Sequence, residues 1–359
     1  MKVLLHIGSE KTGTTSIQHW AAANRAALAA RGILYPAAPG ERANARPEPN
    51  HVGLALAVSE RARAPGLLGM LGLPDAAAAA DFAARMEPRL AEEIAAAGCG
   101  TLLLSNEHLS SRLRDEREVA ALRALVERAA GRVAEWRVVL YHRRQDAMIQ
   151  SIHAMVVLNG GTQPFRLDAN PRDQRLDPRP ILGHYARVFG EDAVAVRVFD
   201  RARLVGGDAV ADLFSLLGVD PREAGFARPP DANVSLGGSA LELLRLLNAH
   251  VPPTREGQRN PVRLALVSAL RRLPPEPRMA LAPRDALDAF LARYDEANAE
   301  IARRWLRRPD GVMFDPPDEA ERALPVAAPL TAARAVELLA PILSRALDTP
   351  AGRRRKEQG

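Results

Sequence analysis

The chain has few of the residues that mark several common classes of protein. Its 359 residues include one cysteine, Cys99, which excludes an intramolecular disulfide and a cysteine-based metal cluster and is typical of a reducing compartment. Aromatic residues are scarce, at 3 Trp, 4 Tyr and 8 Phe, which argues weakly against a flat aromatic cage for a ligand. No apolar run approaches the roughly 20 residues of a membrane span. We therefore expect a cytoplasmic protein without a transmembrane segment.

The two ends of the chain differ in character. Val3–Ile7 is apolar but only as long as a strand, and it runs into a polar loop, so we expect no signal peptide. The net charge is +6, and three arginines, a lysine and a glutamate at 353–357 supply +3 of it. These residues lie in a basic tail, 351–359, that we expect to be disordered. The remaining charge is no signature of nucleic-acid binding, and the oligomeric state stays open.

Apolar runs of strand length alternate with helical patterns along the first two thirds of the chain. The four runs are Val3–Ile7, Thr101–Ser105, Arg137–Tyr141 and Ala193–Phe199. After the first run and its loop, apolar residues recur at helical spacing from Ile17 until Gly32. Strands that alternate with helices predict an α/β fold with a doubly wound, mostly parallel sheet.

The remaining sequence predicts further helices and two insertions. The helices are expected at Ala76–Ala97, Asp208–Leu217, Gly238–His250, Arg284–Leu306 and Thr331–Leu347. We expect one domain over residues 1–350, with residues 36–97 and 255–324 as insertions outside its core. Residues 255–283, rich in proline and arginine, are expected to be irregular in part.

A polar loop lies between the first strand and the first helix, at residues 6–16. A helix N-terminus presents free N–H groups to an anion. Gly13 allows a close approach of the backbone, Lys11 adds a point charge, and residues 14–16 add hydroxyl donors. A Walker A loop ends in Gly-Lys-Ser/Thr, whereas here the lysine precedes the glycine. The loop predicts a phosphate site, and a merely capped helix start is the alternative.

The residues Lys11-Thr12-Gly13-Thr14-Thr15 resemble the 5′-phosphosulfate loop of the sulfotransferases that use 3′-phosphoadenosine 5′-phosphosulfate (PAPS). That loop has the form Lys-Ser/Thr-Gly-Thr-Thr after the first strand of a P-loop-like fold. The resemblance implies that Lys11 binds the oxygen that bridges phosphate and sulfate. It also implies that the 5′-phosphate is held by Thr12, Gly13, Thr14, Thr15 and Ser16.

A second segment resembles the 3′-phosphate motif of the same family, in which an arginine ends a strand and a serine follows eight positions later. Arg143 and Ser151 have this spacing after the strand Arg137–Tyr141. Arg144 replaces the asparagine that is common in the animal cytosolic enzymes, so either arginine could reach the phosphate. An Arg-Arg pair alone is usually a solvated surface feature, but its register with the first motif favours the phosphate.

Two weaker resemblances extend the match to about Gly218. Phe199 ends the strand whose aromatic residue stacks on adenine in the family, and a plain core aromatic is an equal alternative. Residues 233–236, Asn-Val-Ser-Leu, are similar to a segment of bacterial members, with no role assigned. The family's C-terminal glycine-containing adenine loop has no recognisable counterpart here.

Sulfuryl transfer to a hydroxyl needs a base near the carboxyl ends of the strands. Glu107 and His108 follow the strand Thr101–Ser105, and the family uses either residue type. We favour Glu107. The alternative is that Glu107 only begins a helix and His108 faces solvent. We also expect His51, which precedes an apolar stretch, to line the acceptor pocket, although a lone histidine is more often structural.

These observations favour a PAPS-dependent sulfotransferase that needs no metal and releases 3′,5′-ADP. Its acceptor is expected to be a hydroxyl on a carbohydrate or glycolipid, with a small natural-product alcohol as the second choice. The two insertions are expected to form the acceptor pocket. A nucleotide-dependent kinase with an atypical phosphate loop is an alternative, and Asp200 would then be its magnesium ligand. A non-catalytic nucleotide-binding or scaffold protein is another.

Overall fold

The structure is a computed structural model of the chain, and it describes residues 1–42, 46–170, 173–229, 236–255 and 258–347. Contacts divide the chain into two compact units, where the sequence predicts one domain over residues 1–350. The first unit comprises Met1–Arg144, Asn170–Asn233 and Tyr294–Asp315. The second comprises Gln145–Ala169, Val234–Arg293 and Pro316–Gly359. The basic tail and the segment 233–235 lie outside the described residues.

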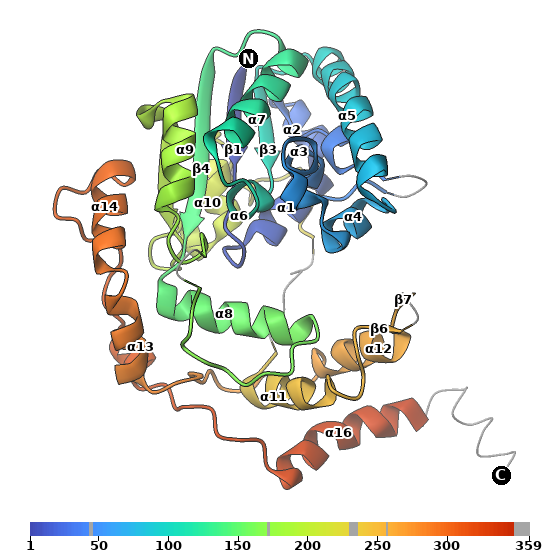
Figure 1. Cartoon of the computed structure of the whole chain (residues 1–359), viewed down its shortest axis with the longest axis vertical. Helices are drawn as coiled ribbons and strands as arrows, with labels where there is room; N and C mark the ends of the chain where they lie inside the picture. The colour runs from blue at the N-terminus through green and yellow to red at the C-terminus, as the bar shows by residue number, and fades with distance from the viewer. Residues whose placement is uncertain (43–45, 171–172, 230–235, 256–257, 348–359) are drawn as a thin grey trace, which may run out of the picture. The chain divides into compact units, whose positions relative to one another are not determined.

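The first unit contains a five-stranded, all-parallel sheet in the order β2-β3-β1-β4-β5 (Figure 1). Its strands are β1 (Lys2–His6), β2 (Ile33–Leu34), β3 (Thr101–Ser105), β4 (Glu135–His142) and β5 (Val194–Val198). In the register, Leu5 of β1 lies beside Leu104 of β3 and Val138 of β4. The predicted α/β fold is confirmed. Of the five strands of this sheet, β2 alone was not predicted, because a strand of two residues is too short to show an apolar pattern.

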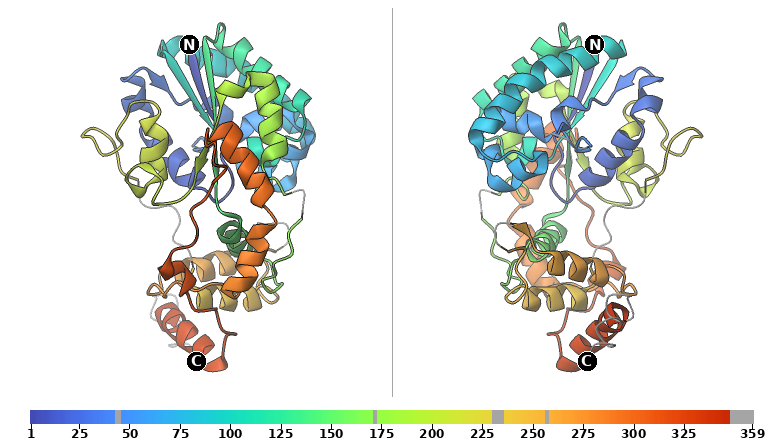
Figure 2. Two further views of the ribbon diagram at one scale, coloured as in Figure 1. Left: turned by 90° about the vertical axis from the view of Figure 1, so that its left-hand side faces the viewer. Right: turned by 90° about the vertical axis from the view of Figure 1, so that its right-hand side faces the viewer.

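Helices cover both faces of this sheet, as Figure 2 shows. Alternate residues of each strand point to opposite faces, so Val3 and Leu5 join one apolar cluster and Leu4 joins the other. The first face is covered by α3 (Val52–Val58), α4 (Pro65–Leu71), α5 (Ala76–Ala97), α6 (His108–Ser111), α7 (Glu116–Ala130), α9 (Arg179–Phe189) and α14 (Asp295–Trp305). The second face is covered by α1 (Thr14–Ala23), α2 (Arg25–Ala29) and α10 (Ala209–Ser215).

The segment 36–97 belongs to the core of the first unit, so its prediction as an insertion outside the core is wrong. Leu54 and Leu56 of α3 and Leu90 of α5 are fully buried in the same apolar cluster as the sheet. Helix α5 has the bounds that the sequence predicts, and Asp75 caps it by accepting a hydrogen bond from the Ala78 N–H. Its alanines place small residues between the large apolar ones, which allows close packing.

The second unit is built from helices and one short hairpin. Its elements are α8 (Gln145–Leu158), α11 (Gly238–Leu247), β6 (Thr254–Arg255), β7 (Gln258–Arg259), α12 (Pro261–Leu270), α13 (Arg284–Ala292), α15 (Glu319–Arg322) and α16 (Ala332–Leu347). Four short 3-10 turns, at Ala38–Gly40, Glu60–Arg63, Glu191–Ala193 and Val205–Gly207, complete the first unit. Val157, Leu244 and Leu270 lie in an apolar cluster of the second unit's own.

The predicted single helix over Arg284–Leu306 is wrong. The chain leaves the helical conformation at Tyr294, which has φ −111° and ψ 6°, and α13 and α14 belong to different units. The sequence has no proline or glycine there to signal the break. The predicted insertion 255–324 therefore contributes to both units.

In the described residues, no single helix has the length and hydropathy of a membrane span. Helices α4 and α5, which are bent by 47° relative to each other, reach that length and hydropathy only when they are taken together.

Three fully buried histidines of the first unit predict a loss of stability in mild acid. Burial lowers the pKa of His6 and of His51 to about 3 and that of His142 to about 4. The unfolded chain binds these protons with a pKa near 6.5 and the folded chain does not. The free energy of unfolding should therefore fall as pH drops below about 6.5, by up to about 4 kcal/mol per pH unit for three histidines.

Urea denaturation at about pH 7, 6 and 5 measures this slope above the range in which carboxylates titrate. His51→Gln should reduce the slope by about one proton, and His250→Gln, at an exposed position, serves as the control variant. A free energy of unfolding that stays constant over this range would contradict the prediction.

Candidate functional site

The candidate site lies where β1, the central strand, ends. The loop from Ile7 to Gly13 joins β1 to α1, and it holds three residues with positive φ: Gly8 at 57°, Lys11 at 68° and Gly13 at 77°. The neighbouring strands β3 and β4 are parallel to β1, so the loops that follow all three strands lie at one edge of the sheet. In doubly wound sheets, ligands bind at this carboxyl edge, where the chain order reverses.

The N-terminus of α1 follows directly on this loop. Gly13 is the N-cap residue, no side chain caps the helix, and no acidic residue occurs in the first turn. The first N–H groups of a helix have no partner within it, and the helix dipole adds partial positive charge. The arrangement suits a phosphate or sulfate group, as the sequence predicts.

Hydroxyl groups inside the loop hold its shape. Thr12 and Thr14 both donate to the carbonyl oxygen of Ser9, at 2.6 and 3.0 Å, and both are buried. Their hydroxyl hydrogens are therefore committed to the protein, whereas the sequence predicts them as phosphate donors. Thr15 and Ser16 are only partly buried in the first turn of α1. Of the four predicted hydroxyl donors, these two have the better access to a ligand.

Two other predicted residues, Phe199 and Arg143, meet this loop. A Cβ atom added at Gly13 would lie 3.2 Å from Cε2 of Phe199 and 2.8 Å from Cβ of Ala209. Arg143 follows β4, and its Nη1 donates to the carbonyl oxygen of Lys11 at 3.5 Å. Its guanidinium carbon lies 5.9 Å from the centre of the Phe199 ring. The structure thus brings Lys11, Gly13, Arg143 and Phe199 together.

The second predicted arginine and the serine are placed differently. Arg144 is buried, whereas Arg143 is partly exposed beside the loop. This difference favours Arg143 as the residue that faces a ligand. Ser151 lies on α8 in the second unit, while Arg143 belongs to the first. Their joint role at one phosphate stays a prediction.

Glu107 lies directly against the start of the loop. A Cβ atom added at Gly8 would come within 3.1 Å of the Glu107 Cα atom. The buried amide of Gln18 donates to Oε2 of Glu107 at 2.8 Å and also reaches Oγ of Ser105 at 3.4 Å. The hydroxyl of Ser105 in turn lies 2.8 Å from Nδ1 of His6. A buried polar network therefore fixes one oxygen of this carboxylate.

His108 belongs to a second, charged cluster at the same edge. Its Nδ1 lies 3.8 Å from Oε1 of Glu10, and the Ser111 hydroxyl donates to the same oxygen at 3.1 Å. The other oxygen of Glu10 accepts from Arg175 at 2.9 Å, and Arg175 is also paired with Asp173. The side chain of His108 is mostly buried, so the alternative that it faces solvent does not hold.

Gln18, Glu10 and Arg175 were not predicted as members of these clusters. Gln18 falls one helical turn after Thr14 on the buried side of α1, which is a signal that could have been read. Glu10 directly precedes Lys11, the first residue of the phosphosulfate motif. Arg175 lies 165 positions from Glu10 in an irregular segment, and no local pattern indicates this contact.

His51 is enclosed within the first unit, and the prediction that it lines the acceptor pocket is corrected. The residue is fully buried, its Nδ1 accepts from the Ser105 N–H at 3.0 Å, and its Nε2 donates to the carbonyl oxygen of Pro36 at 3.0 Å. Both ring nitrogens are used, so His51 ties the segment before α3 to the end of β3.

Asp200, the candidate magnesium ligand of the kinase alternative, is exposed and accepts a hydrogen bond from the Ala202 N–H at 2.8 Å. Its carboxylate shapes the turn after β5. Among the described residues, no group of three or more His, Cys, Asp or Glu side chains is arranged to hold a metal ion.

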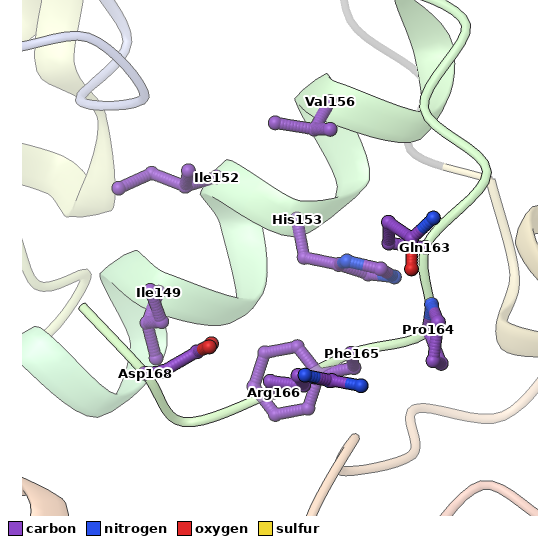
Figure 3. Close-up of a pocket in the computed structure, with 9 residues that line it drawn as sticks. All are labelled: Ile149, Ile152, His153, Val156, Gln163, Pro164, Phe165, Arg166 and Asp168. Atoms are coloured by element: carbon purple, nitrogen blue, oxygen red, sulfur yellow. The ribbon is translucent and has the colours of Figure 1, made fainter. Parts of the chain in front are cut away.

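The second unit has a surface pocket of its own, with a volume of about 280 Å³. Figure 3 shows that it lies between α8 and the segment that follows it. Ile149, Ile152, His153 and Val156 line it from α8, and Gln163, Pro164, Phe165, Arg166 and Asp168 line it from the other side. The His153 ring packs edge-on against Phe165, with 5.3 Å between ring centres.

Comparison with known proteins gives little guidance on function. No protein-family model matches the chain, and no solved structure matches it. A stretch of 115 residues is 28% identical to a protein of Archaeoglobus fulgidus that is described only as uncharacterized. That stretch is 31% of this chain and 30% of the relative, so the chain matches less than a third of the relative's length.

The crowding at Gly13 predicts that a methyl group there disturbs the site. Gly13→Ala combines an unfavourable left-handed conformation with a Cβ atom 2.8 Å from Ala209. Gly98→Ala is the matched control, because Gly98 has φ 58° but nothing within 4 Å of an added Cβ atom. The control should lose about 1–2 kcal/mol of stability, and Gly13→Ala about 1–3 kcal/mol more. Urea denaturation measures both, and equal losses would contradict the crowding.

Proposed function

We propose that this chain is a sulfotransferase that moves a sulfuryl group from PAPS to a hydroxyl on a carbohydrate or glycolipid. The observation that carries the proposal is the uncapped N-terminus of α1, with Lys11 before it and Arg143 and Phe199 beside it. An anion site of this kind, flanked by two cations and an aromatic ring, has a partner for each part of a phosphorylated adenosine. Two candidate bases, Glu107 and His108, follow the adjacent strand β3.

Each part of the nucleotide then has an assigned group on the protein. The first N–H groups of α1 and the hydroxyls of Thr15 and Ser16 hold the 5′-phosphosulfate. Phe199 stacks on adenine, and Arg143 binds the 3′-phosphate. Lys11 neutralises the charge that develops on the phosphate oxygen as the bond to sulfur breaks.

The transfer is an in-line displacement at sulfur. The acceptor oxygen forms a bond to sulfur while the bond from sulfur to the phosphate oxygen breaks, and 3′,5′-ADP leaves. The hydroxyl proton of the acceptor passes to a base on the protein. We assign this role to Glu107, because Gln18 holds its Oε2 and its Oε1 accepts no hydrogen bond within the described residues. His108 is instead engaged beside Glu10 and Ser111.

The 3′-phosphate distinguishes this proposal from its alternatives, and Arg143→Ala is the variant that tests it. Calorimetry should show tighter binding of 3′,5′-ADP than of 5′-ADP to the native protein. Arg143→Ala should weaken 3′,5′-ADP about 10- to 100-fold and change 5′-ADP little, because a charge-assisted contact contributes about 1.5–3 kcal/mol. Arg137→Ala, at an exposed position on the same strand, is the control and should change neither.

Two results would count against the proposal. Tighter binding of ATP with magnesium than of 3′,5′-ADP would favour the kinase. Binding of 3′,5′-ADP without transfer of labelled sulfate from PAPS into any carbohydrate or lipid fraction would favour a nucleotide-binding protein.

The assignment of the base predicts that Glu107→Gln lowers the rate of sulfate transfer about 10²- to 10⁴-fold. The amide keeps the size of the side chain but cannot take a proton, so the affinity for 3′,5′-ADP should stay unchanged. The matched variant His108→Gln should keep most of the activity. The reverse pattern, with an active Glu107→Gln and an inactive His108→Gln, would move the role to the histidine.

A further inference from the structure

Helix α12 of the second unit is apolar on both of its sides. Leu266, Val267 and Leu270 pack in the apolar cluster of this unit. Val262 is 63% exposed and Leu264 is 53% exposed, and they lie at the two flanks of the side that is turned away from this cluster. Between these two flanks, Pro261, Ala265 and Ser268 are exposed. A surface helix normally presents polar residues to water, so this outer face of α12 indicates a contact with an apolar partner.

Arginines lie at both ends of the outer face. Arg255 and Arg259 belong to the hairpin of β6 and β7, and Arg271 and Arg272 follow the last turn of the helix. The hairpin is fixed to the start of α12, because the Asn260 N–H donates to the carbonyl oxygen of Pro253 and the Asn260 amide donates to that of Pro252, both at 2.9 Å. The cations therefore flank the apolar residues at fixed positions.

The net charge of this region is positive. Residues 251–283 contain six arginines and two glutamates, with no aspartate or lysine. One of the six, Arg263, is buried and donates to the carbonyl oxygens of Val157 and Leu158, so it stabilises the interior of the unit and does not belong to the surface. The other arginines accompany the exposed apolar residues, and the region has the composition of a cationic, partly apolar surface.

We propose that the outer face of α12, with Arg255, Arg259, Arg271 and Arg272, docks on the surface of a bilayer that contains anionic phospholipids. The aliphatic side chains enter the boundary between head groups and acyl chains, and the guanidinium groups bind the phosphates of the head groups.

Two observations favour a bilayer over a protein partner. A second copy of the chain that used the same face would bring its arginines against those of the first, since both ends of the helix are cationic. Protein interfaces also rely on aromatic anchors, and Pro261, Val262, Leu264 and Ala265 include none.

The proposal does not depend on the sulfotransferase activity, and its test uses no enzyme assay. The full chain is mixed with phosphatidylcholine vesicles, or with vesicles that also contain phosphatidylglycerol, and bound protein is measured by flotation. We expect binding to the anionic vesicles, little binding to the neutral ones, and release at high salt.

Two double variants separate the apolar and the charged contributions. Val262→Ser with Leu264→Ser should weaken binding about tenfold or more, because the residues that enter the lipid are lost. Arg271→Gln with Arg272→Gln should weaken it about fivefold for each arginine removed. Val312→Ser, at a position 47% exposed in the first unit, is the control and should bind as the native protein does.

Every variant keeps residues 348–359, so any attraction of the basic tail to lipid is common to all of them. Circular dichroism and thermal unfolding establish that the variants fold, which is expected for changes at exposed positions. Equal binding of the native protein and both double variants would overturn the proposal. So would a dimer in analytical ultracentrifugation that the apolar variant abolishes, since the face would then join protein chains.

Discussion

The pairing of β1 with a parallel strand on each side is the constraint on which the candidate site depends. Because β3 and β4 run in the same direction as β1, all three strands deliver their following residues to one edge of the sheet. Lys11, Glu107 and Arg143 come from these three places. Both faces of the strands are covered by apolar helices, so the edge is the part of the sheet where polar groups can gather.

The polar groups beneath this edge are buried, and most of them are paired with one another, although Nε2 of His6 has no hydrogen-bond partner within the described residues. Gln18 links Glu107 to Ser105, Ser105 contacts His6, and the N–H of Ser105 donates to His51. A network of neutral partners of this kind holds the carboxylate in place. The Glu10 cluster is different, because it joins full charges, and it ties the loop to a segment more than 150 positions away.

The sequence predicted elements well where the pattern was local and long enough. β3 and α5 have the predicted bounds, because apolar runs, alanines and caps mark them. The packing of residues 36–97 against the sheet could not be predicted, because the apolar pattern of a helix shows that one face is buried but not which element packs on that face. The break at Tyr294 has no sequence signal, because the contacts of α13 and α14 with different units decide it.

In the candidate site, the residues that belong to local motifs were predicted, and the contacts that depend on the folded loop were not. Lys11, Gly13 and Arg143 belong to short motifs next to predicted strands, and the structure brings them together with Phe199. The hydroxyl bonds of Thr12 and the enclosure of His51 depend on how the loop and the neighbouring segment fold, which spacing does not reveal. The predicted fold class is confirmed, whereas the reaction and its substrates remain proposals.

The first unit cannot complete its apolar core until α14, near the end of the chain, has been synthesised. Its strands and helices come from three separate stretches, and Ile301 and Trp305 of α14 pack in the same apolar cluster as β5. A nascent chain can pair all five strands once β5 has left the ribosome, but one face of the sheet stays partly open until α14 follows about a hundred residues later. For that interval Val194, Val196 and Val198 lack the part of their cover that α14 provides, and the growing chain exposes them to whatever chaperone meets it.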